Sequence, residues 1–224
     1  MRFFCLVAAM LAASVAFAPD VGAQSGNENW SRCHHRNPDV IVGGCTAIIQ
    51  SGQETAKNLA VAFNNRGNAY SVKGQYDRAI EDYDQALRLK PDDSEVLTNR
   101  GSAYDDKGQA DRAIQDYDQA IRLKPDYAMA FHNRGVTYGK KGDYDRAIED
   151  FDQAIRLRPD YAAAFFHRGL TYGNKGQYDR AIEDFDQAIR FKPDYAEAVY
   201  YRGIAKLKKG DTAGGNADIA KAKQ

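Results

Sequence analysis

Apolar and polar residues alternate along most of the chain with the period of an amphipathic helix. In one representative stretch, two apolar stripes with spacings of three and four residues are formed by Phe63, Gly67 and Tyr70 and then by Ile80, Tyr83 and Leu87. This spacing places the members of each stripe on one helix face. Gly74 lies between the stripes, where a turn needs a residue that tolerates positive φ, and Pro91 ends the second stripe. The stretch therefore predicts two antiparallel helices that must bury their apolar faces against neighbours.

The same stretch recurs with a period of 34 residues. Arg-Gly is found at 66, 100, 134, 168 and 202, and the helix-ending proline at 91, 125, 159 and 193. Residues 128–161 and 162–195 are identical at 26 of 34 positions, so these two units have nearly the same structural requirements. A repeat of this length predicts stacked helical hairpins.

Features that every unit shares belong to the scaffold. An arginine precedes the glycine in all five units, and the second helix of each full unit carries an aspartate: Asp82, Asp116, Asp150 and Asp184. We therefore expect repeated Arg–Asp pairs between helices, because five copies of one active site are a far less economical explanation.

One unit carries the residues of a known signature, namely Phe63, Gly67, Tyr70, Ala79, Tyr83, Ala86 and Pro91. With this order of aromatic, Gly, Tyr, Ala, aromatic, Ala and Pro, the unit resembles the tetratricopeptide repeat. The resemblance implies an all-α fold, a right-handed superhelical solenoid of antiparallel helix pairs. Gly67 and Ala79 would let the two helices of a pair approach closely, and the aromatic residues would fill the gaps around that contact.

Four full units are expected, at residues 60–93, 94–127, 128–161 and 162–195. A degenerate fifth unit at 196–224 is expected to close the array as a cap, because Lys206 replaces the tyrosine and Gly215 replaces the helix-contact alanine. In the N-terminal segment, 24–59, residues 39–50 have the apolar spacing of an isolated second helix. We interpret this segment as a half repeat, to which Cys33 would tie the incoming strand of chain.

The first 23 residues have the features of a signal peptide. Arg2 is followed by an apolar stretch from Phe3 to Ala18 and then by the small residues 21–23. Cleavage is expected after Ala23, and a cut after Ala18 is the alternative. The apolar stretch is shorter than the roughly 20 residues that span a bilayer, so a retained membrane anchor is the weaker interpretation. The prediction is a periplasmic or secreted protein with no membrane insertion after signal removal.

Two cysteines remain after removal of the signal, Cys33 and Cys45. In an oxidising compartment, a disulfide between them is the expected state. The alternative is a pair of free thiols, with Cys45 filling a small apolar space.

Charge and motifs narrow the function classes. The 31 Lys and Arg balance the 31 Asp and Glu, which argues against nucleic acid or a membrane surface as a partner. The sequence has no Gly-rich phosphate loop, no paired-cysteine metal motif and no Gly-x-Ser-x-Gly elbow. We expect no enzyme, cofactor or metal. The alternative from another class is a metal or catalytic site through His132 and His167, which the repeat register places on neighbouring first helices. Two imidazoles are fewer than the three protein ligands of a catalytic zinc site.

In the family that the chain resembles, the first helices line a concave groove. Ligand contacts there come mainly from the residues two before and two after the arginine. The first series is Asn64, Thr98, His132, Phe166 and Tyr200, and the second is Asn68, Ser102, Val136, Leu170 and Ile204. Adding the neighbouring Asn99 and His167, we predict a peptide-binding surface of Asn64, Asn68, Thr98, Asn99, His132, Val136, Phe166, His167, Leu170, Tyr200 and Ile204.

This surface changes from amide and hydroxyl groups at its N-terminal end to aromatic and aliphatic groups at its C-terminal end. The gradient suggests a directional ligand, an extended or helical peptide segment of a partner protein. Two alternatives remain for the apolar end: the chain's own C-terminal helix covers it, or a second copy does so in a homodimer.

Some members of the family grip a C-terminal carboxylate with two Lys, one Arg and two Asn. Asn68 and Asn99 match the two asparagines, but Asn64, Met129 and Asn133 stand where the cations should be. Without cations the carboxylate would lose its charge-assisted hydrogen bonds, so we expect no such grip.

Overall fold

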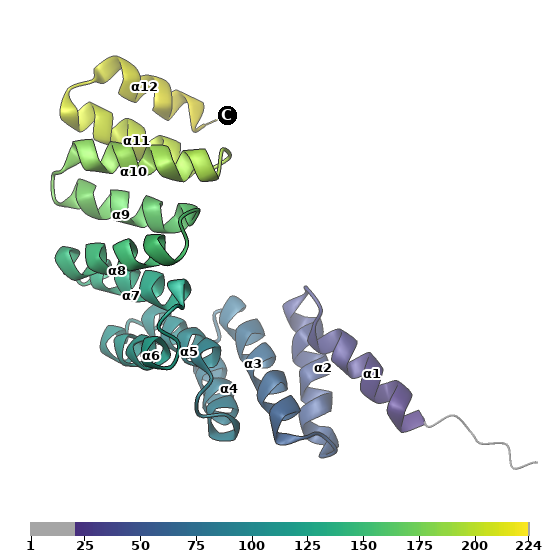
Figure 1. The fold of residues 1–224 in the computed structure, drawn as a ribbon. Coiled ribbons are helices and arrows are strands. Elements are labelled where there is room, and N and C mark those ends of the chain that lie inside the picture. The colour runs from purple at the N-terminus through teal and green to yellow at the C-terminus, as the bar shows by residue number, and fades with distance from the viewer. Residues whose placement is uncertain (1–20, 224) are drawn as a thin grey trace, which may run out of the picture.

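The structure is a computed structural model that describes residues 21–223, with side chains from Gly26 onward. This part of the chain consists of α-helices in sequential antiparallel pairs, which form a curved array (Figure 1). The helices are α1 (Val21–Cys33), α2 (Pro38–Ser51), α3 (Ala56–Val72), α4 (Tyr76–Leu89), α5 (Ser94–Asp106), α6 (Ala110–Leu123), α7 (Ala128–Lys140), α8 (Tyr144–Leu157), α9 (Ala162–Asn174), α10 (Tyr178–Phe191), α11 (Ala196–Lys209) and α12 (Thr212–Lys221). The all-α repeat fold is therefore confirmed. Nearly all of the predicted signal peptide lies outside the described residues.

Close contact within a pair depends on glycine in the first helix. A Cβ placed on Gly67 would lie 2.7 Å from Cε1 of Tyr83, and one on Gly135 would lie 2.9 Å from Cε1 of Phe151. Ala79 is fully buried beside this contact. The turn after the first helix is made by Gly74, whose φ of 69° is in the left-handed region that favours glycine. The expected roles of Gly67, Gly74 and Ala79 are confirmed.

The expected Arg–Asp pairs are present in every unit. Arg100 donates from Nε and Nη2 to the two oxygens of Asp116, at 2.8 and 2.7 Å, which joins the two helices of its own unit. Its Nη1 donates to Asp84 of the preceding unit at 2.6 Å. Arg134, Arg168 and Arg202 repeat both contacts. Each of these arginines therefore also connects successive units, which the sequence did not predict.

The N-terminal segment differs from the half repeat that we expected. Residues 21–33 form helix α1 rather than an extended strand of chain, so α1 and α2 make a complete pair. The interpretation of α2 as a second helix agrees with its contacts. Asp39 pairs with Lys73 as Asp77 pairs with Lys107, and Thr46 accepts from Arg66 where Asp84 accepts from Arg100.

Cys33 and Cys45 form the predicted disulfide, with an Sγ–Sγ distance of 2.02 Å. The bond joins the end of α1 to α2. A Cβ on the adjacent Gly44 would lie 2.6 Å from the backbone nitrogen of Cys33, so a side chain there would separate the two helices. In this pair Gly44 and the disulfide hold the two helices together, whereas later units place a glycine against an aromatic ring.

The C-terminal unit keeps the pairing of the others despite its divergent sequence. Arg202 bonds both oxygens of Asp218, and Lys206, which replaces the tyrosine, donates to the same carboxylate at 2.8 Å. A Cβ on Gly215 would lie 2.8 Å from the carbonyl oxygen of Gly203, so α11 and α12 are in direct backbone contact. None of the helices within residues 21–223 is both long and apolar enough to cross a membrane.

Candidate peptide-binding groove

The first helices of successive units, α3, α5, α7, α9 and α11, are neighbours in the array and together make what we call the first-helix face. Two hollows lie on this face. The C-terminal hollow has a volume of about 230 Å³ and lies between α9 and α11 above α10. Its lining consists of Gly169, Leu170, Gly173, Asn174, Tyr178, Phe185, Tyr201, Ile204, Ala205 and Lys208. Leu170 and Ile204, which we predicted as site residues, therefore line the same hollow.

The central hollow lies between α5 and α7, and most of the residues that line it carry polar groups. It is lined by Ser102, Asp105, Asp106, Tyr117, His132, Asn133, Val136, Lys140 and His167. Three of the predicted site residues, His132, Val136 and His167, belong to it. Asp105 and Asp106 were not among the predicted residues, although they follow Ser102 by three and four residues and therefore lie on the same side of α5.

Most of the residues two positions before the arginine of each unit are buried, which corrects the prediction that this series lines an open surface. Thr98 is only 1% exposed, and His132 and Phe166 are each 8% exposed. Thr98 donates its hydroxyl to the carbonyl oxygen of Ser94, within its own helix. Tyr200 alone of this series is an exposed large side chain, at 39%.

Phe166, which we expected to be exposed, is covered by the chain's own C-terminal units. Its ring centroid lies 5.9 Å from that of Phe185, 4.8 Å from that of Tyr195 and 5.9 Å from that of Tyr201. These rings come from α10, the following turn and α11. Phe166 therefore supports the wall of the C-terminal hollow and is not itself a surface anchor. A ring of this size reaches the neighbouring unit, where it buries more apolar area than it would on the surface.

Tyrosine hydroxyls on the second helices explain part of the polar-to-apolar gradient along the first-helix face. Tyr83 donates to Oδ1 of Asn68 at 2.7 Å, and Tyr117 donates to Oγ of Ser102 at 3.3 Å. In the next two units, the equivalent rings are Phe151 and Phe185, and the residues above them are Val136 and Leu170. Each polar residue two after the arginine thus lies over a tyrosine. The prediction did not include this pairing, although the sequence carries its signal: the change from Tyr83 and Tyr117 to Phe151 and Phe185 coincides with the change from polar to apolar residues above them.

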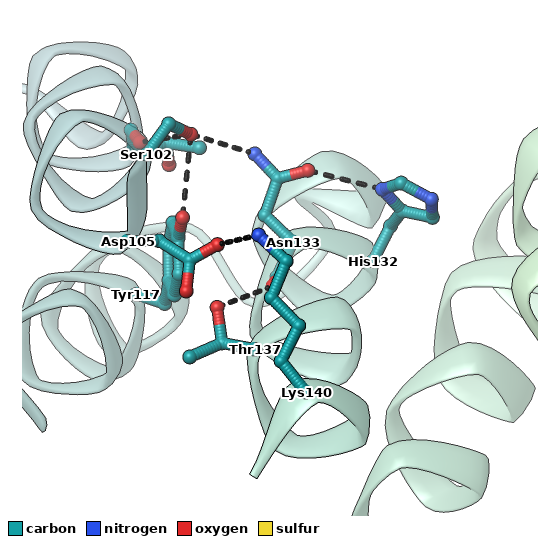
Figure 2. A network of polar contacts seen from close by, with 8 residues as sticks. Ser102, Asp105, Tyr117, His132, Asn133, Thr137 and Lys140 are labelled. Atoms are coloured by element: carbon teal, nitrogen blue, oxygen red, sulfur yellow. Dashed lines mark hydrogen bonds and ion pairs between the residues drawn. The ribbon is translucent and has the colours of Figure 1, made fainter. Parts of the chain in front are cut away.

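The polar groups of the central hollow bond to one another (Figure 2). Asn133 donates from Nδ2 to Ser102 at 3.2 Å, and Ser102 donates to the carbonyl oxygen of Thr98 at 3.1 Å. Lys140 reaches across from α7 to Asp105 on α5, at 2.7 Å. Nearer the N-terminus, Asn99 donates to Oδ1 of Asn64 at 3.0 Å. These contacts connect neighbouring first helices along the floor of the face.

His132 and His167 lie together, as the repeat register predicted; His132 is buried and His167 is half-buried. Nδ1 of His167 is 2.9 Å from the carbonyl oxygen of Ala163 and 3.1 Å from Nε2 of His132. Because a carbonyl only accepts, we assign the hydrogen to Nδ1 of His167, and Nε2 of His132 is then an acceptor. Nδ1 of His132 lies 3.0 Å from Oδ1 of Asn133 and donates to it.

Burial, with His167 close by, lowers the pKa of His132 to about 4, and burial also lowers the pKa of His167. Both rings are therefore neutral at pH 7. Three of their four ring nitrogens are used in the contacts just described. In the described part of the chain, no group of three or more His, Cys, Asp or Glu is arranged to hold a metal ion.

Comparisons with known proteins agree on the repeat. Residues 60–93, 82–115, 101–142, 132–196 and 168–215 match sequence profiles described as tetratricopeptide repeat or TPR repeat. The crystal structure of MamA aligns at 30% identity with a TM-score of 0.62, covering 70% of this chain and 91% of that one. No curated protein matches the chain.

Two further solved structures are alike in fold. A tetratricopeptide repeat protein from Parabacteroides merdae ATCC 43184 aligns at 22% identity with a TM-score of 0.72, covering 88% of this chain and 78% of that one. YrrB, described as a TPR protein with an unusual peptide-binding site, aligns at 24% identity with a TM-score of 0.59, covering 80% and 90%.

Proposed function

Because the chain belongs to the tetratricopeptide repeat family, we propose that it is an exported scaffold that holds a peptide segment of a partner protein on its first-helix face. The observation that carries this proposal is the C-terminal hollow. Leu170, Ile204 and Tyr201 give it apolar walls, and the ring centroid of the exposed Tyr200 lies 5.4 Å from that of Tyr201. An apolar hollow with an aromatic rim suits one buried hydrophobic side chain of a ligand.

Two observations support export. Residues 1–23 have the composition of a signal peptide, and the Cys33–Cys45 disulfide is of a kind that persists in oxidising compartments. The partner is then a protein of the same envelope or extracellular compartment. The description of YrrB as peptide-binding is in keeping with the proposal, although that likeness concerns the fold alone.

The alternative of a metal or catalytic site through His132 and His167 gains nothing from the geometry. The two rings bond to each other, to Asn133 and to Ala163, so a metal would have to displace the contacts that connect α7 to α9. Calorimetric titration with zinc or copper tests this alternative. A tight stoichiometric site that disappears in a His132→Ala, His167→Ala double variant would favour it over the scaffold.

Substitutions drawn from the chain's own repeats test the proposed function. Asn68 is the residue of the first unit at the positions of Leu170 and Ile204, so the double variant Leu170→Asn, Ile204→Asn introduces a side chain that the repeat carries at this position, here without the hydroxyl partner that Tyr83 gives Asn68. Leu123→Asn serves as control, because it makes the same leucine-to-asparagine change at an exposed position at the end of α6, outside both hollows.

Random 12-residue peptides displayed on phage are selected on the wild-type chain, and the best binders are measured on both variants by fluorescence anisotropy. The double variant loses the apolar anchor and is expected to bind more weakly by about 2 kcal/mol, the scale of a hot spot. The control keeps the anchor and is expected to bind like wild type. Equal binding to wild type and the double variant would refute the proposed site. Circular dichroism confirms that each variant remains folded.

A further inference from the structure

The two hollows of the first-helix face differ in charge, and this difference specifies the ligand. The central hollow holds the carboxylates of Asp105 and Asp106 against one ammonium, that of Lys140. His132 and His167 add no charge at pH 7. In the C-terminal hollow the one charged residue of the lining is Lys208. The face is thus negative at its centre and positive at its C-terminal end.

The acidic residue that matters is Asp106. Lys140 neutralises Asp105 at 2.7 Å, whereas no ion pair among residues 26–223 uses Asp106, which is exposed. Asp106 is also the last residue of α5, where the helix dipole is negative and a carboxylate is unfavourable. The equivalent residues of the other units are Val72, Lys140, Asn174 and Lys208. Asp106 therefore does nothing that the scaffold requires, and its field attracts a cation.

Lys208 has the opposite position. It lies in the last turn of α11, beside apolar walls that include Leu170 and Ile204. Its neighbour Lys206 is bonded to Asp218, and Lys209 is paired with Asp179, but no ion pair among residues 26–223 uses Lys208. An acidic group next to an apolar side chain of the ligand complements this hollow.

Resting on the proposed function, we infer that the ligand is an extended peptide segment with a basic residue for the central hollow and an apolar residue beside an acidic one for the C-terminal hollow. The spacing follows from helix packing. The centres of the hollows are two first helices apart, which at about 8–10 Å per helix gives about 16–20 Å, and Asp106 and Lys208 are three first helices apart, about 24–30 Å. At about 3.3 Å per residue, the basic and the acidic residue of an extended peptide are therefore about seven to nine residues apart, with the apolar residue about five or six from the basic one.

The experiment uses the peptides selected on the wild-type chain, with affinities measured on two charge-reversed variants. Lys208→Glu and Asp106→Lys each reverse one of the proposed contacts. Lys223→Glu and Asp126→Lys are matched controls, because they change the net charge equally at exposed positions outside both hollows. Each reversal is expected to weaken the selected peptide three- to tenfold, the scale of a rim charge pair that becomes a repulsion. Neither control is expected to change it.

A charge-swapped peptide makes the test specific. Replacing the acidic residue of the selected peptide by lysine should restore its affinity for Lys208→Glu and lower it for wild type. If the reversed variants bind like their controls while Leu170→Asn, Ile204→Asn still loses the peptide, the charge assignment is wrong and the proposed function stands. If no selected peptide distinguishes wild type from that double variant, the proposed function fails as well. If sedimentation instead shows a dimer that the double variant dissociates, the occupant is a second copy of the chain and the inference is overturned.

Discussion

Replacing His132 by phenylalanine should remove a large part of the acid sensitivity of the fold. His132 is buried between the rings of Phe151 and Tyr161, at 5.9 and 5.0 Å. One unit later, Phe166 lies between Phe185 and Tyr195 at 5.9 and 4.8 Å. The substitution therefore copies an arrangement that the chain already contains, and it removes one titrating group while keeping the packing.

The sign follows from the direction of the pKa shift. In the unfolded chain the imidazole takes up a proton near its usual pKa of about 6.5, whereas burial lowers the pKa of His132 to about 4 in the fold. Its contribution to stability is therefore complete above pH 6.5 and is lost as the pH falls from 6.5 toward 4. Linkage over this window gives a loss of about 2 kcal/mol between pH 7 and pH 5.

Other ionisable groups surround His132 and His167 and could contribute to the change in stability between pH 7 and pH 5. Arg158 and Lys140 oppose protonation of His132 and His167 respectively, and Asp105 and Asp106 lie across the central hollow on α5. Tyr161 and Tyr117 stay neutral in this range, because burial raises the pKa of each. These groups are common to wild type and His132→Phe, so the difference between the two proteins reports the titration of His132 together with its effect on the neighbouring His167.

Urea unfolding followed by circular dichroism at pH 7 and pH 5 measures this difference. The free energy of unfolding of wild type should fall by about 2 kcal/mol more than that of His132→Phe over this range. The double variant His132→Phe, His167→Tyr, which copies the pair Phe166 and Tyr201, should be the least sensitive to acid. An equal loss in wild type and both variants would refute the assignment of a lowered pKa to His132.

Three further predictions concern the scaffold. Reducing the disulfide, whose cysteines are 12 residues apart, should lower the free energy of unfolding by about 3 kcal/mol, measured by urea unfolding with and without reductant. Asp116→Ala leaves Arg100 without its buried partner and should cost about 3 kcal/mol, whereas Asp111→Ala, at an exposed pair, should leave the unfolding midpoint unchanged. Gly135→Val should cost about 1–3 kcal/mol through its clash with the ring below, whereas Gly173→Ala meets no atom within 4 Å and should stabilise by about 0.5–1 kcal/mol, both read from thermal melts.

The repeated parts of the fold were predictable because identical residues recur at one period. Gly67, Ala79 and the Arg–Asp pairs have the same neighbours in each unit, so a single physical argument covered all of them. Helix α1 was not predicted, because residues 24–33 have only Trp30 as a large apolar side chain and no stripe of helical spacing. Its contact with α2 depends on the disulfide and on Gly44, a tertiary arrangement that no local pattern encodes.

The candidate site was predictable only in part. Leu170 and Ile204 meet in the C-terminal hollow as the slot series implied, and His132 reaches His167 as the register implied. The prediction that Phe166 is exposed was wrong, because a position in the repeat gives the direction in which the Cβ points but not whether neighbouring side chains cover the side chain. A large ring at that slot turns into the gap between units, where neighbouring rings bury it.

Hydrogen exchange of the chain with and without a selected peptide tests the central claim most directly. The account predicts slower exchange of backbone amides in α9 and α11 when the peptide is bound, with smaller protection in α5 and α7, because the hollows lie on these first helices. The second helix α8, which lines neither hollow, should show little direct protection. Protection confined to the second helices or to α1 and α2 would contradict the claim that the first-helix face holds the partner.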